Sequence, residues 1–148
     1  MTQWVEQTGG GRDRGPVALV RAWAEVLRRP RRFFGAAIAP GDQAPGLVFA
    51  VFVTLAHVGL RFAADPGLAP VYQGQPVLSA VFALAVVALF FAPLSLHLVA
   101  AVQTLLLRPF VPDRAGVSET VQVIAYATAP VIFAAVPVPA VQLGAAAW

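Results

Sequence analysis

The feature that most constrains this chain is a series of three long apolar segments with very few charged residues. They run over residues 44–64, 77–107 and 119–136, and Glu119 lies at the start of the third. About twenty residues of α-helix at about 1.5 Å each span about 30 Å, which matches the hydrocarbon core of a bilayer. The pattern therefore predicts an all-α membrane protein with about three transmembrane helices.

The composition agrees with this prediction. Hydrophobic residues make up 59% of the chain and charged residues only 11%, so few charges are left to cover the apolar surface. Soluble domains have about 45–50% apolar and about 25% charged residues. The ten basic residues are all arginines and lie beside the apolar segments, so we interpret them as topology signals and expect no nucleic-acid partner. The chain has no cysteine, which excludes disulfides and thiol chemistry.

Residues 1–15 are polar and glycine-rich, which is typical of a flexible tail. Residues 16–34 follow as a predicted amphipathic helix, because Pro16 suits a first helical turn and the apolar and charged residues then alternate at helical spacing. Pro30 is expected to end its regular part. The apolar side carries Leu19, Val20, Trp23 and Leu27, and the other side carries Arg21, Glu25 and Arg28.

The end of this helix has the chemistry of a membrane surface. Guanidinium groups bind anionic head groups, and aromatic rings enter the interface. We favour a helix lying on the membrane, fixed in part by Trp23, over the alternative of a solvated helix that packs on another part of the protein. The predicted membrane-surface residues are Arg28, Arg29, Arg31, Arg32, Phe33 and Phe34.

The second apolar segment is longer than one straight span requires. Pro93 lies within it and lacks the N–H that the carbonyl of Leu89 would accept in a regular helix. We expect a single helix kinked at Pro93. A hairpin of two short helices with Pro93 at its apex is the alternative, but neither half would cross a bilayer.

The third segment carries Pro130, and Pro137 and Pro139 are expected to end it. The apolar stretch that follows is too short to cross a membrane. Seven of the ten arginines precede the first segment, and Arg108 and Arg114 lie between the second and third. The positive-inside rule then predicts a cytoplasmic N-terminus and a location in the cell membrane.

Polar residues inside the apolar segments are the first candidates for function. The two histidines, His57 and His97, are expected at different depths, and no carboxylate accompanies them, so we predict no metal or other cofactor. Interhelical hydrogen bonding is the expected role of these side chains. Catalytic serine, zinc-protease and paired-acid motifs are also missing from the sequence, and we therefore predict no enzyme activity.

The order of these segments resembles a known family. A helix ends in Arg-Pro-Arg-Arg-Phe-Phe (29–34), two apolar segments and a short polar loop follow, and Tyr126-x-x-x-Pro130 then lies inside an apolar helix. This is similar to the Yip (Ypt/Rab-interacting protein) domain family in its prokaryotic or archaeal branch, over residues 44–148 and the helix before them. The family implies a helical bundle of about five spans, of which this chain would be a short or truncated form.

The resemblance implies a multi-pass membrane protein that is not an enzyme and that organises membrane or partner proteins. A subunit of a transporter or channel is the alternative. Tyr126 and Pro130 are the motif residues, and Pro130 is expected to kink the helix and to leave the Tyr126 carbonyl unpaired. The expected partners are the bilayer, with anionic lipids at the N-terminal helix, and either a second copy of the chain or other membrane proteins.

Overall fold

A computed structural model describes residues 15–38, 41–111 and 116–148, in which every regular element is a helix. Three of these helices are long and apolar enough to cross a membrane: Ala44–Ala64, Pro76–Leu107 and Val117–Ala135. The predicted fold class is therefore confirmed, and the helix bounds agree with the predicted segments within two residues. The predicted flexible tail lies outside the described residues, apart from Gly15, and so do residues 112–115 of the loop before the third helix.

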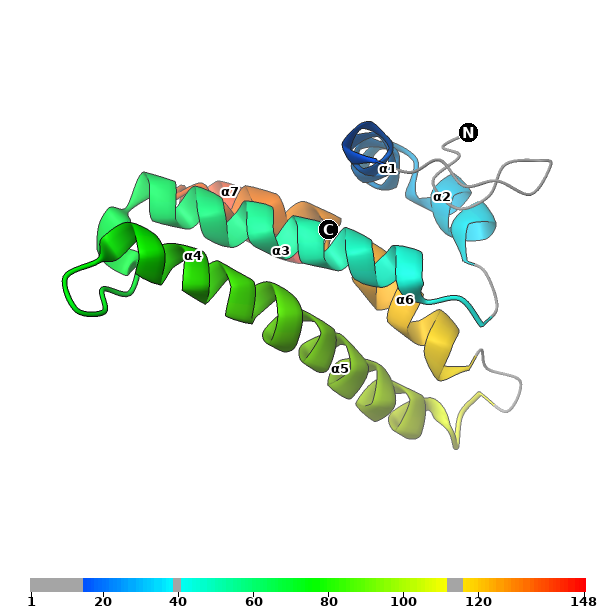
Figure 1. Cartoon of the computed structure of the whole chain (residues 1–148). Coiled ribbons are helices and arrows are strands. Elements are labelled where there is room, and N and C mark those ends of the chain that lie inside the picture. The colour runs from blue at the N-terminus through cyan, green and yellow to red at the C-terminus, as the bar shows by residue number, and fades with distance from the viewer. Residues whose placement is uncertain (1–14, 39–40, 112–115) are drawn as a thin grey trace. The chain divides into compact units, whose positions relative to one another are not determined.

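The chain forms two compact units, and each long helix contributes to both. The first unit comprises Met1–Ala50 and Ser95–Ala129, and the second comprises Val51–Leu94 and Pro130–Trp148. Figure 1 labels the helices.

The N-terminal region of the first unit forms two helices where the sequence predicted one. Helix α1 spans Pro16–Arg28 and α2 spans Pro30–Ala37. Arg29 separates them with φ −142° and ψ 57°, outside the helical region. Helix α1 ends just before Pro30, as expected. Pro30 then takes the first position of α2, where its missing N–H has no helical partner to lose.

The inner face of α1 also differs from the predicted one. Helix α1 packs against α2 and α6 (Val117–Ala127) through its small side chains, and it buries Ala18, Ala22 and Val26. Val20 was expected on the apolar face but is 50% exposed. Small residues at every fourth position let two helix backbones approach closely, and the hydrophobicity pattern alone gives these alanines little weight.

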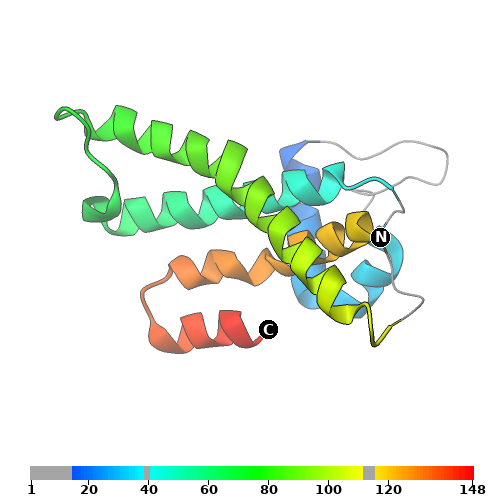
Figure 2. The same cartoon turned by 90° about the horizontal axis from the view of Figure 1, so that it is seen from below.

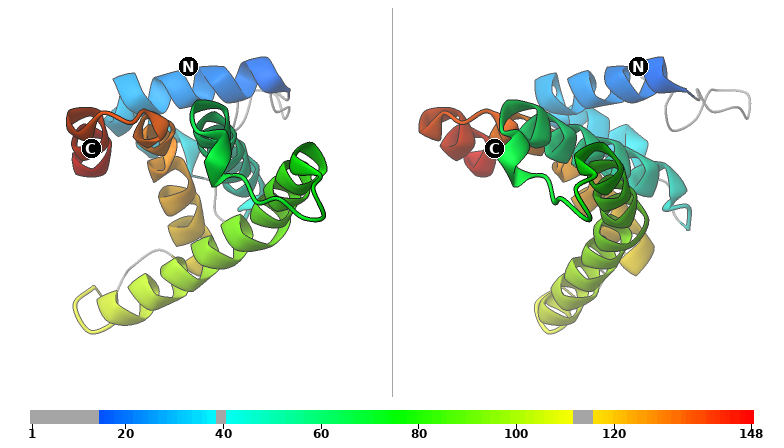
Figure 3. Two further views of the ribbon diagram at one scale, coloured as in Figure 1. Left: turned by 90° about the vertical axis from the view of Figure 1, so that its left-hand side faces the viewer. Right: turned by 60° about the vertical axis from the view of Figure 1, so that its left-hand side comes forward.

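The second long helix is continuous from Pro76 to Leu107, so the hairpin alternative is wrong. It consists of α4 (Pro76–Val86), a π-helical turn η2 (Val87–Phe91) and α5 (Ala92–Leu107). The uninterrupted run is seen in both views of Figure 3. The backbone N–H of Ala92 reaches back five residues to the carbonyl of Val87. Such a wide turn is a common way for a helix to accommodate a break in its hydrogen-bond ladder, here directly before Pro93.

The third long helix changes its type at the expected proline. Helix α6 ends at Ala127, and a 3₁₀ helix, η3, continues over Ala129–Ala135. Helix α7 (Pro139–Ala147) belongs to the second unit and runs back beside η3, as Figure 2 shows. The side chain of Gln142 donates a hydrogen bond to the carbonyl of Ala134 over 3.3 Å, which links the two helices.

Most large apolar side chains of the second long helix are exposed and do not pack within the chain. In the first unit the small core consists of Ala50, Leu96 and Ala125, with Leu47 and Ile124 against it. Along Pro76–Leu107, by contrast, large side chains such as Phe82, Phe90 and Leu105 are each about two-thirds exposed. A protein in water rarely presents such a continuous apolar surface, whereas lipid is the natural solvent for it. The three helices are thus consistent with a membrane protein.

Candidate functional site

The centre of the first unit is an aromatic cluster formed by Phe33, Phe49 and Tyr126. These residues come from α2, α3 (Ala44–Ala64) and α6, and all three are almost fully buried. The Tyr126 ring meets Phe33 edge to face with centroids 4.9 Å apart and Phe49 with centroids 5.1 Å apart. In this geometry the positive edge of one ring approaches the negative face of another. The cluster therefore fixes α2 to the first and third long helices.

Phe33 had been predicted to contact the membrane surface, and this assignment is wrong. Its side chain is 2% exposed because the ring packs against Tyr126. Phe34 is half-buried and touches Phe33 edge to face at 5.9 Å. At helical spacing, two adjacent rings point in directions about 100° apart, so one can enter the protein while the other stays near its surface.

A second contact ties α1 to the third long helix. The indole Nε1–H of Trp23 donates a hydrogen bond to the carbonyl of Ala129 over 2.7 Å. Ala129 is fully buried and directly precedes Pro130, at the point where the helix changes from α to 3₁₀. A buried carbonyl without a donor costs about 1–3 kcal/mol. Trp23 therefore stabilises the irregular backbone beside the proline, where the sequence had suggested a membrane anchor.

The Tyr126 carbonyl is also satisfied differently from the prediction. It was expected to be unpaired, but the backbone N–H of Thr128 reaches the carbonyls of both Ala125 and Tyr126. The Thr128 hydroxyl adds a hydrogen bond of 2.6 Å to the Ala125 carbonyl. A threonine placed two residues before Pro130 thus supplies donors that the proline cannot.

Close packing of α3 on α6 completes the frame around the cluster. A Cβ atom added to Gly46 would lie 3.1 Å from Cα of Gln122 and 3.3 Å from Cβ of Ala125. Glycine is needed there for the close approach of two backbones. Gln122 itself is 1% exposed, so its amide lies within the helix packing.

The outer surface of α1 and α2 is cationic. The arginines at positions 28, 29, 31 and 32 are all exposed, and so is Arg21. Exposed Val17 and Val20 lie beside them on α1. We call this surface of exposed arginines and valines the arginine face: Val17, Val20, Arg21, Arg28, Arg29, Arg31 and Arg32.

His57 forms the kind of interhelical hydrogen bond that was expected of it. In the second unit its Nδ1 lies 2.9 Å from the carbonyl oxygen of Val131, so the imidazole of α3 is bonded to η3. A carbonyl can only accept, and this bond therefore requires the proton on Nδ1. His57 and Arg61 also line a hollow of about 210 Å³. His97 belongs to the first unit, where it is half-buried on α5.

The ionisable side chains do not gather into a metal site in the part of the chain that the structure describes, where no group of three or more His, Cys, Asp or Glu residues is found. Sequence reasoning identified Tyr126 and Pro130 but missed Gly46 and the bond from Trp23 to Ala129. A glycine followed four residues later by Ala50 on an apolar helix is the signal that could have identified the close helix contact.

The chain was compared with protein families, with curated proteins and with solved structures. No family model matches it, no curated protein matches it, and no solved structure matches it.

Proposed function

We propose that this chain is a Yip-like multi-pass protein of the cell membrane that organises membrane or partner proteins without catalysing a reaction. The observation that carries the proposal is the arrangement of α1 and α2, which are held to the third long helix on one side and present the arginine face on the other. A helix pair fixed in this way is suited to bind a surface.

Membrane insertion is the first step of the proposal. The outward side chains of the second long helix are large and apolar, with Leu89 of η2 at 70% exposure and Leu94 of α5 at 66%. Burying one such side chain is worth about 1.5–3 kcal/mol. Lipid can supply this burial along the whole length of a helix that a small protein core leaves uncovered.

The arginine face gives the second step. Its guanidinium groups are exposed on α1 and α2, and two exposed valines lie among them. Each basic residue near an anionic membrane surface contributes about 1 kcal/mol of attraction. We infer that this face lies against the anionic head groups of the cytoplasmic leaflet, where it holds the N-terminus inside the cell.

The role of the motif residues supports the Yip-like part of the proposal. Tyr126 is the centre of the aromatic cluster, and Pro130 follows the carbonyl that Trp23 binds. Both residues thus act on the helix pair that carries the arginine face. In this proposal the motif is a structural link between the membrane-spanning helices and the surface-binding helices.

The test uses the full chain, which has no cysteine and therefore accepts a single label. A polarity-sensitive dye on Val20→Cys is followed after reconstitution into phosphatidylcholine vesicles with or without phosphatidylglycerol. We expect a blue shift with the anionic lipid that salt weakens, and a much smaller shift when Arg28, Arg31 and Arg32 are changed to Gln. A dye on Val71→Cys is the control. If the emission of the dye at position 20 depends neither on lipid charge nor on salt, the proposal is contradicted.

Ion flux through the same vesicles separates this function from transport. We expect proton and potassium flux equal to that of protein-free vesicles. If the native chain gives a flux above this level and the His57→Leu variant gives a lower flux, the proposal is wrong and the chain is a transporter or channel subunit.

A further inference from the structure

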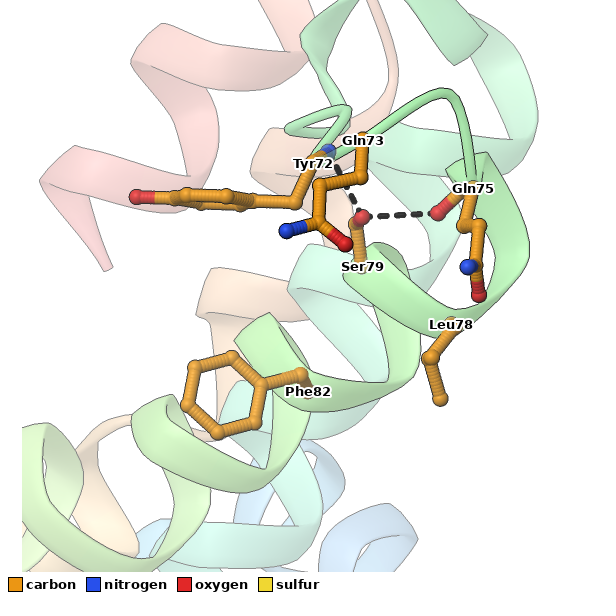
Figure 4. A pocket seen from close by; sticks show the side chains of 6 residues that line it. All are labelled: Tyr72, Gln73, Gln75, Leu78, Ser79 and Phe82. Atoms are coloured by element: carbon orange, nitrogen blue, oxygen red, sulfur yellow. Dashed lines mark hydrogen bonds between the residues drawn. The ribbon is translucent and has the colours of Figure 1, made fainter.

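A pocket of about 320 Å³ lies in the second unit where the loop before α4 meets the first two turns of that helix. Tyr72 and Gln73 border it from the loop, and Gln75, Leu78, Ser79 and Phe82 border it from the start of the helix (Figure 4). The last four residues are spaced by three or four positions, so they share one face of α4.

The loop side of the pocket is a tight turn with a defined shape. Gln73 has φ 50° and Gly74 has φ 72°, and the N–H of Gln75 donates to the carbonyl of Tyr72 over 2.9 Å. Positive φ at both central residues is characteristic of a type I′ turn. The turn places the side chains of Tyr72 and Gln73 above the helix start.

Ser79 locks this turn to α4. Its hydroxyl donates to the carbonyl of Gln75 over 2.7 Å and accepts from the N–H of Tyr72 over 2.8 Å, as the dashed lines in Figure 4 mark. The side chain is 5% exposed, so these bonds are protected from solvent. The floor of the pocket is therefore preformed, which lowers the entropic cost of binding a ligand.

The chemistry of the lining selects the kind of ligand. The six residues include no charged group, but the amides of Gln73 and Gln75 and the phenol of Tyr72 offer neutral donors and acceptors. Neither amide side chain forms a hydrogen bond with the rest of the described chain, and the Gln75 side chain makes no capping bond. Their hydrogen-bonding capacity is therefore left for a ligand.

The apolar part of the lining continues beyond the pocket. Leu78 and Phe82 are exposed by 63% and 65%, and exposed Val81 lies between them in sequence on the same helix. Because Pro76 begins the longest apolar helix of the chain, the change from polar to apolar lining coincides with the end of a candidate span. This is the depth at which the ester groups of a lipid meet its acyl chains.

We propose that this pocket binds diacylglycerol through its uncharged glycerol hydroxyl and ester groups, because the described lining residues include no cation to pair with a phosphate. The ester carbonyls and hydroxyl of the lipid pair with the amides of Gln73 and Gln75, and an acyl chain lies along Leu78 and Phe82. A volume of about 320 Å³ is at the small end of ligand sites, which fits the polar part of a lipid while its chains lie outside. This proposal rests on the membrane insertion in the proposed function. It adds a specific lipid-binding site at the start of α4.

The probe is a diacylglycerol with a diazirine on one acyl chain, added to the full chain in phosphatidylcholine vesicles. After irradiation, labelled peptides from the start of α4 are compared with peptides from the exposed face of α5 near Leu105. We expect the start of α4 to be labelled more strongly than α5. Unlabelled diacylglycerol should reduce the labelling of α4, and phosphatidylglycerol should not. Labelling that is equal on both faces would overturn the site but leave membrane insertion standing, and no labelling of either face would overturn both.

Variants connect the labelling to the amides. Gln73→Gly removes one amide and suits the positive φ, and Gln75→Ala removes the other without loss of a cap. Loss of two neutral hydrogen bonds predicts at least about tenfold weaker labelling of α4 in the double variant. The matched control is Gln103→Ala, which removes an exposed amide from α5 and should leave labelling of α4 unchanged. The melting temperature of the double variant in detergent should equal that of the native chain. If α4 of this variant is then labelled as strongly as α4 of the native chain, the proposal is wrong.

Discussion

Single small residues determine how closely the helices of the first unit approach. The Cβ of Gly46→Ala would lie 3.1 Å from a backbone atom of α6, so one of the two helices must move. Overpacking of this kind costs about 1–3 kcal/mol. We therefore expect Gly46→Ala to lower the free energy of unfolding by about this amount, measured by titration from mild detergent into dodecyl sulfate.

The control is Gly59→Ala in the same helix, where an added Cβ meets nothing within 4 Å. Alanine is the better helix former by about 1 kcal/mol, so this variant should be as stable as the native chain or more so. Equal losses from both substitutions would contradict the role of the helix contact, because an added Cβ at Gly59 meets no neighbour.

The bond from Trp23 to Ala129 is the other residue-scale feature with a measurable consequence. Trp23→Phe keeps a ring but removes the N–H donor, which leaves a fully buried carbonyl without its indole partner. We expect a loss of about 1 kcal/mol in the free energy of unfolding. Trp148→Phe at the exposed C-terminus is the matched control and should have no measurable effect.

At the scale of elements, the aromatic cluster governs the attachment of α2. Phe33→Ala removes the ring that meets Tyr126 and should cost about 3–5 kcal/mol locally. Hydrogen exchange of the α2 amides should therefore become much faster, while amides in α4 keep their native rates. Phe34→Ala, which truncates a half-buried ring, should have a smaller effect. Exchange in α2 that is unchanged by Phe33→Ala would contradict the anchoring role of the cluster.

The elements also show what could be predicted from the sequence and why. Span bounds were predictable because about twenty apolar residues in a row have one solution in a bilayer. The start of α2 at Pro30 could not be predicted, because a proline that ends one helix is equally suited to begin the next. The π-helical turn before Pro93 and the 3₁₀ helix after Thr128 depend on which donors lie nearby, and no sequence period encodes that.

The same distinction holds for the candidate site. Tyr126 and Pro130 were recognisable as a motif, and the arginines were recognisable by charge. The partners of Tyr126 were not, because Phe33 and Phe49 are far apart in sequence and meet it only after three helices pack. The pocket at Tyr72 depends on positive φ angles at Gln73 and Gly74, for which a glutamine gives no sequence signal.

At the scale of the whole molecule, the distribution of arginines predicts which ends of the helices face the cytoplasm. Five exposed arginines lie on or between α1 and α2, and Arg108 follows the second long helix. With three crossings, we expect the loop between α3 and α4 to lie outside the cell. Because the native chain has no cysteine, single cysteines can test this order directly.

The three positions for the test are exposed: Gly35 in α2, Val71 in the loop before α4, and Val111 after α5. In intact cells an impermeant maleimide should label Val71→Cys alone, and the other two should react only after the membrane is permeabilised. The contrast follows from the cost of carrying several arginines across the hydrocarbon core, about 2.5–3.5 kcal/mol for each residue on the insertion scale. Labelling of Gly35→Cys and Val111→Cys in intact cells, with Val71→Cys protected, would reverse the orientation and place the arginine face outside.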